Sequence, residues 1–433
     1  MLKRKIFNGI LLSLLSLQIL HATGYVELDL YKNRTCAQDN QGIVSSWFED
    51  SWNSIVSSVN ESVFAENINT DKFWKTLHNS LEDGTFYNRI AGIQLSDPET
   101  GSDLFLRTIY SSIDQIAIKY NSSLPNGDIV TLSGKMFLPK KKNVKNIIIA
   151  NHYTICANSE APSHASSIEG IFATKDYIVL MPDYIGYGLS DSLAHPYLHL
   201  ESTVTSAVDL LKAAIPYLRA NCYTFYSPLI LVGYSQGAAA TLALQKEIEE
   251  KYPYVFSIQK VFAGAGPYDL AGTFDFYINN PTTDIPCSVP MLISGMNYGE
   301  NLGLKQEDFF QPVLQILYPR LIESKTKMMN DVNAELGHDI KTLLKPIIFQ
   351  KESFPTSVLY KAIQRNNILR WTPKSQLYLF HSIEDNMVPF LNSEHLKAEF
   401  DSQQLDNIQY DFAPYGNHMN AAVTFFEKVY MSL

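Results

Sequence analysis

Short apolar runs, separated by loops and helix-like stretches, recur along the chain from residue 146 onward. They span residues 146–150, 177–181, 229–232, 261–264, 376–380 and 408–412. Near-continuous apolar strands that alternate with helices are typical of a parallel sheet buried on both faces. We therefore expect an α/β fold in which helices flank a mostly parallel central sheet.

Strand-like runs also precede this region, at residues 105–109, 115–120 and 130–137. Asn126-Gly127 lies between the last two runs and is a strong turn signal. These features predict an antiparallel entry into the sheet.

The alternation of strands and helices stops between Asp269 and Trp371, where helical patterns such as 312–325 and 355–367 dominate. A structureless loop of this length inside a compact domain is improbable. The pattern therefore predicts a helical cap inserted at residues 271–370, between a first core part at 105–270 and a second at 371–433. Residues 25–104 form a mainly helical region, which we interpret as amphipathic helices packed on the main domain, with a flap over an apolar pocket as the alternative.

The first 24 residues have the pattern of a signal peptide. Lys3, Arg4 and Lys5 precede an apolar stretch at residues 6–20, and the small residues Ala22-Thr23-Gly24 follow it. We expect an exported protein, secreted or periplasmic, with an uncleaved N-terminal anchor as the alternative.

Charge and cysteine content narrow the expectation further. A formal net charge of -10 disfavours binding to nucleic acid, because like charges repel. An even number of cysteines in an exported chain predicts two disulfides, with three pairings to choose from, and buried free thiols are the alternative. The four cysteines are Cys36, Cys156, Cys222 and Cys287.

The run at 229–232 ends in Gly233-Tyr234-Ser235-Gln236-Gly237 and continues into an alanine-rich helical pattern. A Gly-x-Ser-x-Gly motif between a strand and a helix is typical of a nucleophile elbow, a sharp turn that exposes a serine hydroxyl. The alternative is an ordinary glycine-rich turn. Because helix and strand pass close together at such an elbow, it requires small residues, here Gly233, Gly237 and Ala238.

A serine nucleophile needs a base that takes its proton and an acid that orients the base, and in this kind of fold they follow in the order Ser, acid, His. Asp385, just after the run at 376–380, is the predicted acid, with Glu384 as its competitor and a helix-capping carboxylate as the structural alternative. His418, just after the last run, is the predicted base. His381 competes with it, but it lies at a strand end, where it would shape the loop.

Hydrolysis through a tetrahedral intermediate also needs donors for the oxyanion. We predict the backbone N–H of Gln236 and that of Tyr153, with Thr154 as the second choice for the latter; a disulfide at Cys156 could make this loop rigid. His195 and His199 have ligand-like spacing, but Pro196 disrupts a helical turn there, so we expect no metal. The sequence has no dinucleotide fingerprint or phosphate-binding glycine loop, and we expect no cofactor.

Together, the Gly233–Gly237 motif, Asp385 with Val388-Pro389, and His418 resemble the α/β-hydrolase superfamily. The segments 181–188, 195–197 and 265–270 resemble its secreted lipase and esterase branch. The resemblance extends from about residue 105 to the C-terminus. The chain departs from the family at His152-Tyr153 and His381-Ser382, where His-Gly is common.

This resemblance implies hydrolysis of carboxylic esters through an acyl-serine intermediate, without a cofactor. The expected partner is a small-molecule or lipid ester, with transient contact to a lipid interface and no nucleic acid; the oligomeric state is not predicted. Acyl transfer by the same triad, peptide hydrolysis and a non-catalytic binding module on the same fold are the alternatives.

Overall fold

A computed structural model of the chain describes residues 25–32, 36, 71, 74, 75, 77–79, 112–165, 167–226 and 228–433. The predicted signal peptide, the predicted strand at 105–109 and most of the predicted N-terminal helical region lie outside these residues. Within them, every helix is too short or too polar to span a lipid bilayer.

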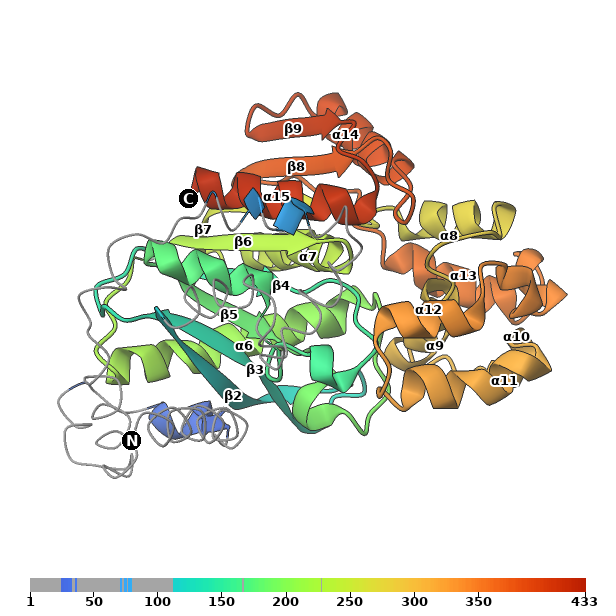
Figure 1. Ribbon diagram of the computed structural model, residues 1–433, viewed down its shortest axis with the longest axis horizontal. Coiled ribbons are helices and arrows are strands. Elements are labelled where there is room, and N and C mark those ends of the chain that lie inside the picture. Colours follow the sequence, from blue (N-terminus) through green and yellow to red (C-terminus); the bar gives the residue numbers. More distant parts are fainter. Residues whose placement is uncertain are drawn as a thin grey trace, which may run out of the picture.

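The described residues contain one sheet of nine strands in the order β1-β2-β3-β5-β4-β6-β7-β8-β9 (Figure 1). The strands are β1 (Val26–Glu27), β2 (Ile113–Ser123), β3 (Ile129–Pro139), β4 (Ile147–Asn151), β5 (Ile178–Pro182), β6 (Pro228–Tyr234), β7 (Ser257–Gly264), β8 (Gln376–Ser382) and β9 (Ile408–Ala413). β3 pairs antiparallel with both β2 and β5, and the strands from β5 to β9 are parallel to one another. The predicted mostly parallel sheet is confirmed.

The predicted turn between β2 and β3 is also present. Gly127 has φ +88°, a value that side chains with a Cβ rarely adopt. The N–H of Asp128 donates to Oδ1 of Asn126 over 3.1 Å. This short connection produces the antiparallel entry that the sequence predicted.

Successive residues of the central strands belong to opposite cores, as the two-residue period of a strand requires. On one face, Ile149 and Leu231 pack with residues of helices α6 and α7. On the other face, Ile148 and Val232 pack with residues of the C-terminal helix α15. Both faces of the sheet are therefore covered at its centre, which explains why the central strands β4, β5 and β6 are almost entirely apolar.

Helices flank the sheet and continue beyond its end (Figure 1). The α-helices are α6 (Leu200–Ala220), α7 (Gln236–Lys251), α8 (Leu270–Asn279), α9 (Ser288–Gly299), α10 (Gln306–Phe309), α11 (Pro312–Tyr318), α12 (Met329–Leu336), α13 (Thr356–Arg365), α14 (Leu391–Ser402) and α15 (His418–Ser432). A single turn of π-helix, Pro319–Glu323, follows α11. Short 3-10 helices occupy Leu28–Tyr31, Asn158–Glu160, Ile168–Lys175, Gly188–Ser190, Ile340–Thr342 and Pro346–Phe349.

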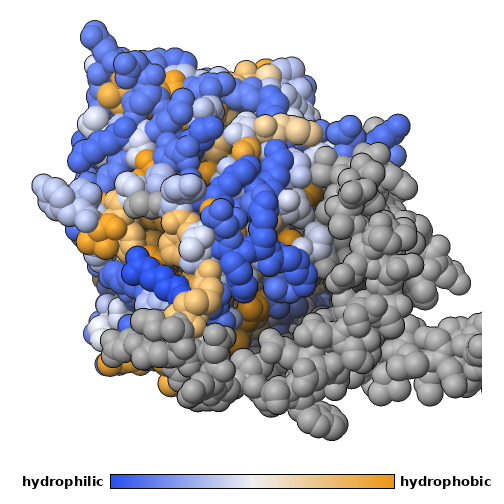
Figure 2. All heavy atoms as spheres, turned by 90° about the vertical axis from the view of Figure 1, so that its left-hand side faces the viewer, coloured by the Kyte–Doolittle hydropathy of each residue, from blue (hydrophilic) through white to orange (hydrophobic). Residues whose placement is uncertain are grey.

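Helices α8 to α13 connect β7 to β8, in the stretch where the sequence predicted a helical cap, and we call them the cap. Figure 1 shows them beyond the arrowheads of the parallel strands, where the strands end at their carboxyl edge. They have an apolar core of their own, to which Phe274, Leu314 and Leu359 belong. Figure 2 shows the opposite side of the molecule, where these strands begin. The described residues that are visible there are mostly hydrophilic, with separate apolar spots.

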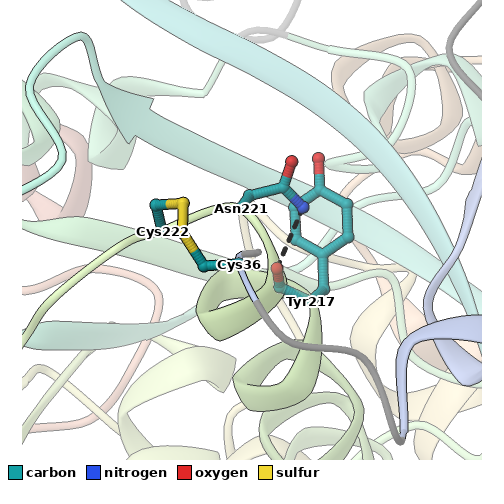
Figure 3. The surroundings of a disulfide bond; sticks show 4 residues. All are labelled: Cys36, Tyr217, Asn221 and Cys222. Carbon is teal, nitrogen blue, oxygen red and sulfur yellow. Dashed lines mark hydrogen bonds between the residues drawn. A yellow bond between two sulfur atoms is a disulfide. The ribbon is translucent and has the colours of Figure 1, made fainter. Parts of the chain in front are cut away.

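One disulfide is present among the described residues, between Cys36 and Cys222 (Figure 3). Cys222 follows the end of α6, where the Asn221 side chain donates to the carbonyl of Tyr217 over 2.9 Å. The expectation of a second disulfide is wrong, because Cys156 and Cys287 are free thiols. Both lie fully buried in the apolar core of the cap, where a thiol packs as a small apolar side chain.

From the predicted N-terminal helical region, Trp74 is described and is buried. Its ring lies 5.9 Å from the ring of Tyr430 on α15. This residue therefore packs against the main domain.

Candidate active site

Ser235 lies at the turn between β6 and α7 and has φ +56° and ψ -126°. A positive φ is rare for a residue with a Cβ, and it persists only where the surrounding structure enforces it. Here the N–H of Ser235 donates to the carbonyl of Gly264 on β7 over 2.9 Å. The turn is thus held by the neighbouring strand, as a nucleophile elbow requires.

The two glycines of the motif are needed because backbone passes close to them. A Cβ at Gly233 would lie 2.1 Å from the carbonyl oxygen of Gly237. A Cβ at Gly237 would lie 2.0 Å from the carbonyl oxygen of Asn151, at the end of β4. Any larger residue at either position would push β6, α7 and β4 apart.

Asp385 and His418 are brought together by the loops that follow β8 and β9. Nδ1 of His418 donates to Oδ2 of Asp385 over 2.6 Å. The carboxylate is fully buried, and the His418 side chain is 5% exposed. With its Nδ1 proton directed at a carboxylate, the neutral imidazole carries its lone pair on Nε2, which is the form that a general base needs.

The carboxylate of Asp385 has further partners, which are two backbone N–H groups and the imidazole of His381. Oδ1 accepts from the N–H groups of Met387 and Val388, each over 2.8 Å. Oδ2 lies 3.3 Å from Nε2 of His381. Burial raises the pKa of Asp385, but the charge of His418 and the hydrogen bonds from His381 and His418 outweigh it, so the pKa lies below its usual value.

His381 is the second imidazole at this carboxylate, and its tautomer follows from its neighbours. Nε2 faces two acceptors, Oδ2 of Asp385 and the carbonyl of Val388 at 3.2 Å, so Nε2 carries the hydrogen. Nδ1 then accepts from the hydroxyl of Ser393 over 2.7 Å. The sequence suggested only that His381 shapes this loop; its contact with the acid was not predicted.

Glu384, the competing acid, points to the backbone instead. Its Oε2 accepts from the N–H of Gly416 over 3.0 Å. Asn386 accepts from the N–H of His418 over 3.2 Å, and the hydroxyl of Ser382 donates to the carbonyl of Gly416 over 2.5 Å. These contacts join the loop of the acid to the loop of the base, so Glu384 supports the backbone around His418 while Asp385 contacts its ring.

Tyr234, the residue before Ser235, connects the end of β6 to His418. Its hydroxyl donates to the carbonyl of His418 over 2.7 Å, and the two rings lie 4.9 Å apart. Asn417 caps α15 by accepting from the N–H groups of Met419 and Asn420. His418 is therefore fixed at the first turn of α15 from two sides.

The predicted oxyanion donors, Gln236 and Tyr153, each line a cavity together with Ser235. Gln236 is the first residue of α7, where backbone N–H groups lack partners within the helix. Tyr153 comes two residues after the end of β4, and it lines a cavity together with Thr154 and Ser235. Both residues are thus placed next to the serine.

The loop after β4 is held by side chains, although no disulfide forms at Cys156. The ring of His152 is stacked on that of Tyr184 at 4.1 Å, and its Nδ1 lies 2.6 Å from the carbonyl of Tyr153. Tyr184 donates to Oδ1 of Asn151 over 3.2 Å, and Tyr187 donates to the carbonyl of Ile155 over 2.6 Å. The segment 181–188 therefore supports this loop, which the sequence had not predicted.

Both ring nitrogens of His195 contact protein groups. Its Nδ1 donates to the carbonyl of Ile185 over 2.7 Å, and its Nε2 lies 3.4 Å from Nε2 of Gln236. Burial lowers the pKa of His195 to about 3, so the ring is neutral and accepts from the Gln236 amide. In the described part of the chain, no cluster of three or more His, Cys, Asp or Glu residues could hold a metal ion.

Two cavities meet at Ser235, and their shared residues are Thr154, Ser235, Ile285 and Met387. The first is also lined by residues of α15, and we call it the α15 cavity. The second is also lined by residues of α8 and α9, and we call it the cap cavity. His418 lines the α15 cavity together with Ser235, so the predicted base and nucleophile face the same space.

Solved structures with known folds resemble this one, at low sequence identity. The rice cell wall degrading esterase LipA from Xanthomonas oryzae has a TM-score of 0.66 and 22% identity, covering 75% of this chain and 92% of its own. A Legionella pneumophila protein assigned as a hydrolase has a TM-score of 0.68 and 21% identity, covering 74% and 88%. Candida antarctica lipase A has a TM-score of 0.55 and 15% identity, covering 71% and 73%.

No protein-family profile and no curated protein sequence matches the chain. At these low identities, similarity in structure is evidence for the fold alone. The order of strands in the sheet of this chain, the elbow at Ser235 and these structural neighbours agree with the resemblance found in the sequence. The chain has the α/β-hydrolase fold.

Proposed function

We propose that the protein is a serine hydrolase that cleaves carboxylic esters. The observation that carries the proposal is the arrangement at the elbow. Ser235 has a strained backbone and faces a cavity also lined by His418, whose Nδ1 is bonded to the buried Asp385 over 2.6 Å. Packing of the fold alone would not require the positive φ of Ser235. A serine, an imidazole and a carboxylate in this arrangement can act as nucleophile, base and orienting acid.

The reaction proceeds in two halves. Oγ of Ser235 bonds to the ester carbonyl carbon while its proton passes to Nε2 of His418. The bond from that carbon to the alcohol oxygen then breaks, and this oxygen keeps the electron pair and takes the proton from His418. Water repeats the sequence on the acyl-serine and releases the acid, with Asp385 stabilising the imidazolium each time.

The oxyanion of each tetrahedral intermediate would accept from the N–H groups of Gln236 and Tyr153. The neutral His195 holds the Gln236 side chain, and His152 and Tyr184 hold the loop of Tyr153. Preorganised donors matter because losing one typically raises the barrier by about 3–4 kcal/mol.

Labelling with a fluorophosphonate and hydrolysis of p-nitrophenyl esters test the proposal. We expect the wild type to be labelled and active, and Ser235→Ala, His418→Ala and Asp385→Asn to lose activity, by roughly 10⁴-fold for the last. Glu384→Gln is the matched control and should retain most activity, since Glu384 contacts only backbone here.

Other outcomes identify the alternatives. A folded wild type without labelling at Ser235 would indicate a binding module. Formation of a new ester when an acceptor alcohol is added would indicate acyl transfer. Rates on an ester below and above its solubility limit test the proposed transient contact with a lipid interface.

We also propose that the protein is exported. The basic and apolar pattern of residues 1–24 and the disulfide between Cys36 and Cys222 support this. Expression of the full chain in a secreting host, followed by N-terminal sequencing, should give a mature protein that begins close to residue 25. A mature protein that still begins at Met1 would contradict cleavage.

A further inference from the structure

The two cavities that meet at Ser235 differ in which reacting group they contain. The α15 cavity includes His418 and, from the same face of that helix, Met419, Ala422 and Phe426. The cap cavity is lined instead by Gln236 and by apolar residues of the cap such as Phe274 and Val289. The two halves of an ester that reacts at Ser235 therefore have two distinct spaces to occupy.

The chemistry of the first half-reaction decides which half goes where. The alcohol oxygen takes its proton from His418, so it must lie against this imidazole when its bond to the carbonyl carbon breaks. The carbon chain attached to that oxygen then extends from the imidazole, and the space lined by His418 is the α15 cavity. The acyl chain is attached to the carbonyl carbon and is left with the cap cavity.

We propose that the α15 cavity binds the alcohol half of the substrate and the cap cavity binds its acyl half. This inference rests on the proposed ester hydrolysis and names its substrate class, which is the ester of an apolar acid with an apolar, uncharged alcohol. Both cavities are lined mostly by apolar side chains, which suit apolar groups on each side of the ester.

Charge at the wall of the α15 cavity narrows the alcohol further. Glu160 lines this cavity, and its Oε2 accepts from the N–H groups of Cys156 and Ala157 over 3.0 and 2.9 Å. The described residues that line this cavity include no Lys or Arg, so an anion such as a phosphorylated alcohol would be buried there without a counter-charge. A neutral alcohol suits this wall better.

Substitutions that fill one cavity at a time test the assignment. Ala422→Phe narrows the α15 cavity, and Val289→Phe narrows the cap cavity. Ala334→Phe is the matched control, because Ala334 is exposed on α12 of the cap and lines neither cavity. Met419→Phe and Leu292→Phe serve as second variants for the two cavities should either first variant fail to fold.

The substrates are methyl butanoate, octyl butanoate and methyl decanoate, which lengthen the alcohol and the acid separately. The measured quantity is kcat/KM, which covers the steps up to departure of the alcohol. We expect Ala422→Phe to lower the ratio of octyl to methyl butanoate by at least roughly tenfold, the scale at which pockets discriminate alkyl size. Val289→Phe should lower the ratio of methyl decanoate to methyl butanoate instead, and Ala334→Phe should change neither ratio.

The results separate this inference from the function on which it rests. A reversed pattern, or equal losses on both ratios with both variants, overturns the assignment of the cavities while ester hydrolysis stands. Failure of the wild type to hydrolyse any of the three esters, or their p-nitrophenyl analogues, overturns the proposed function and this inference together.

Discussion

The carboxylate of Asp385 shows how much one residue depends on groups far away in the chain. Its two oxygens are bonded by two backbone N–H groups of its own loop and by two imidazoles. Such a carboxylate stays ionised despite its burial, and it has a single orientation. The sequence could place an acid after β8, but it could not show that His381 is the second imidazole.

Substitution of His381 tests this contact. A hydrogen bond to a charged group contributes about 1.5–3 kcal/mol, so His381→Phe should lower kcat by roughly 10- to 100-fold. His381→Gln retains a donor and should lose less, and the exposed His338→Phe should lose nothing. Both substitutions at 381 should also raise the pKa of Asp385, because each removes the imidazole that helps to lower it, and an NMR titration of this carboxyl group measures the shift. An unchanged kcat and an unchanged Asp385 pKa in His381→Phe would contradict a role in positioning the acid.

Glu169 is a second buried carboxyl group, but it has no such partners. Neither of its oxygens has a hydrogen-bond partner among the described residues, and burial raises its pKa to about 7. A folded-state pKa above the unfolded value means that stability is fully present below pH of about 4.3 and is lost as pH rises through 7. The buried carboxylate is thus a cost to folding at neutral and alkaline pH.

Glu169→Gln should remove this dependence on pH. We expect the variant to be more stable than the wild type at pH 8, by an amount on the order of 3 kcal/mol, and to differ little at pH 4. The free energy of unfolding from urea titrations at several pH values measures the effect. Glu250→Gln on the exposed side of α7 is the control, and equal pH profiles for Glu169→Gln and the wild type would contradict the prediction.

At the scale of elements, the central strands β4, β5 and β6 could be predicted because burial on both faces makes them almost entirely apolar. Ile148 packs in one core and the next residue, Ile149, packs in the other, so both faces of β4 are apolar. The close approach of β4, β6 and α7 was indicated in the sequence only by Gly233 and Gly237. The sequence does not give the order of strands in the sheet, so it could not show which backbone segments approach these two glycines.

Gly237→Ala tests that crossing. The added Cβ would lie 2.0 Å from the carbonyl oxygen of Asn151, and a backbone atom cannot rotate away as a side chain could. Overpacking typically costs about 1–3 kcal/mol, so we expect a lower Tm. The start of α7 would also move from Ser235, and labelling by a fluorophosphonate should slow. A variant with the Tm and labelling rate of the wild type would show that β4 and α7 do not pass this closely.

At the scale of the whole molecule, the cap could be predicted from the break in the alternation of strands and helices, but its attachment could not. Nζ of Lys325, in the cap, donates to the carbonyls of Asp191 and Leu193 in the core, and the carbonyl of Lys325 accepts from the N–H of Asn158 over 2.8 Å. Burial lowers the pKa of Lys325 to about 8. Contacts of a lysine with backbone carbonyls have no sequence signature, because every residue offers the same acceptor.

The number of free thiols tests how the chain is folded as a whole. The cysteine count suggested two disulfides, whereas the described residues contain one disulfide and two free thiols. Cys36 and Cys222 are 186 residues apart, and their bond ties the N-terminal segment to the end of α6. A hydrogen bond with Cys287, together with burial, raises the pKa of the Cys156 thiol, so it resists reaction in the folded protein. We expect a thiol reagent to find no reactive group in the native protein and two after denaturation without reduction.

Cys222→Ser extends the test, because it breaks the only bridge between described residues and should raise the denatured thiol count to three. Loss of a disulfide typically costs about 2–4 kcal/mol, mainly because the unfolded chain regains the freedom that the bridge removed. The Tm should therefore fall, whereas Cys287→Ser should leave the bridge intact and the count at one. Denatured wild-type protein without any free thiol would show that Cys156 and Cys287 are joined, and the cap would then be tied covalently to the loop that carries Tyr153.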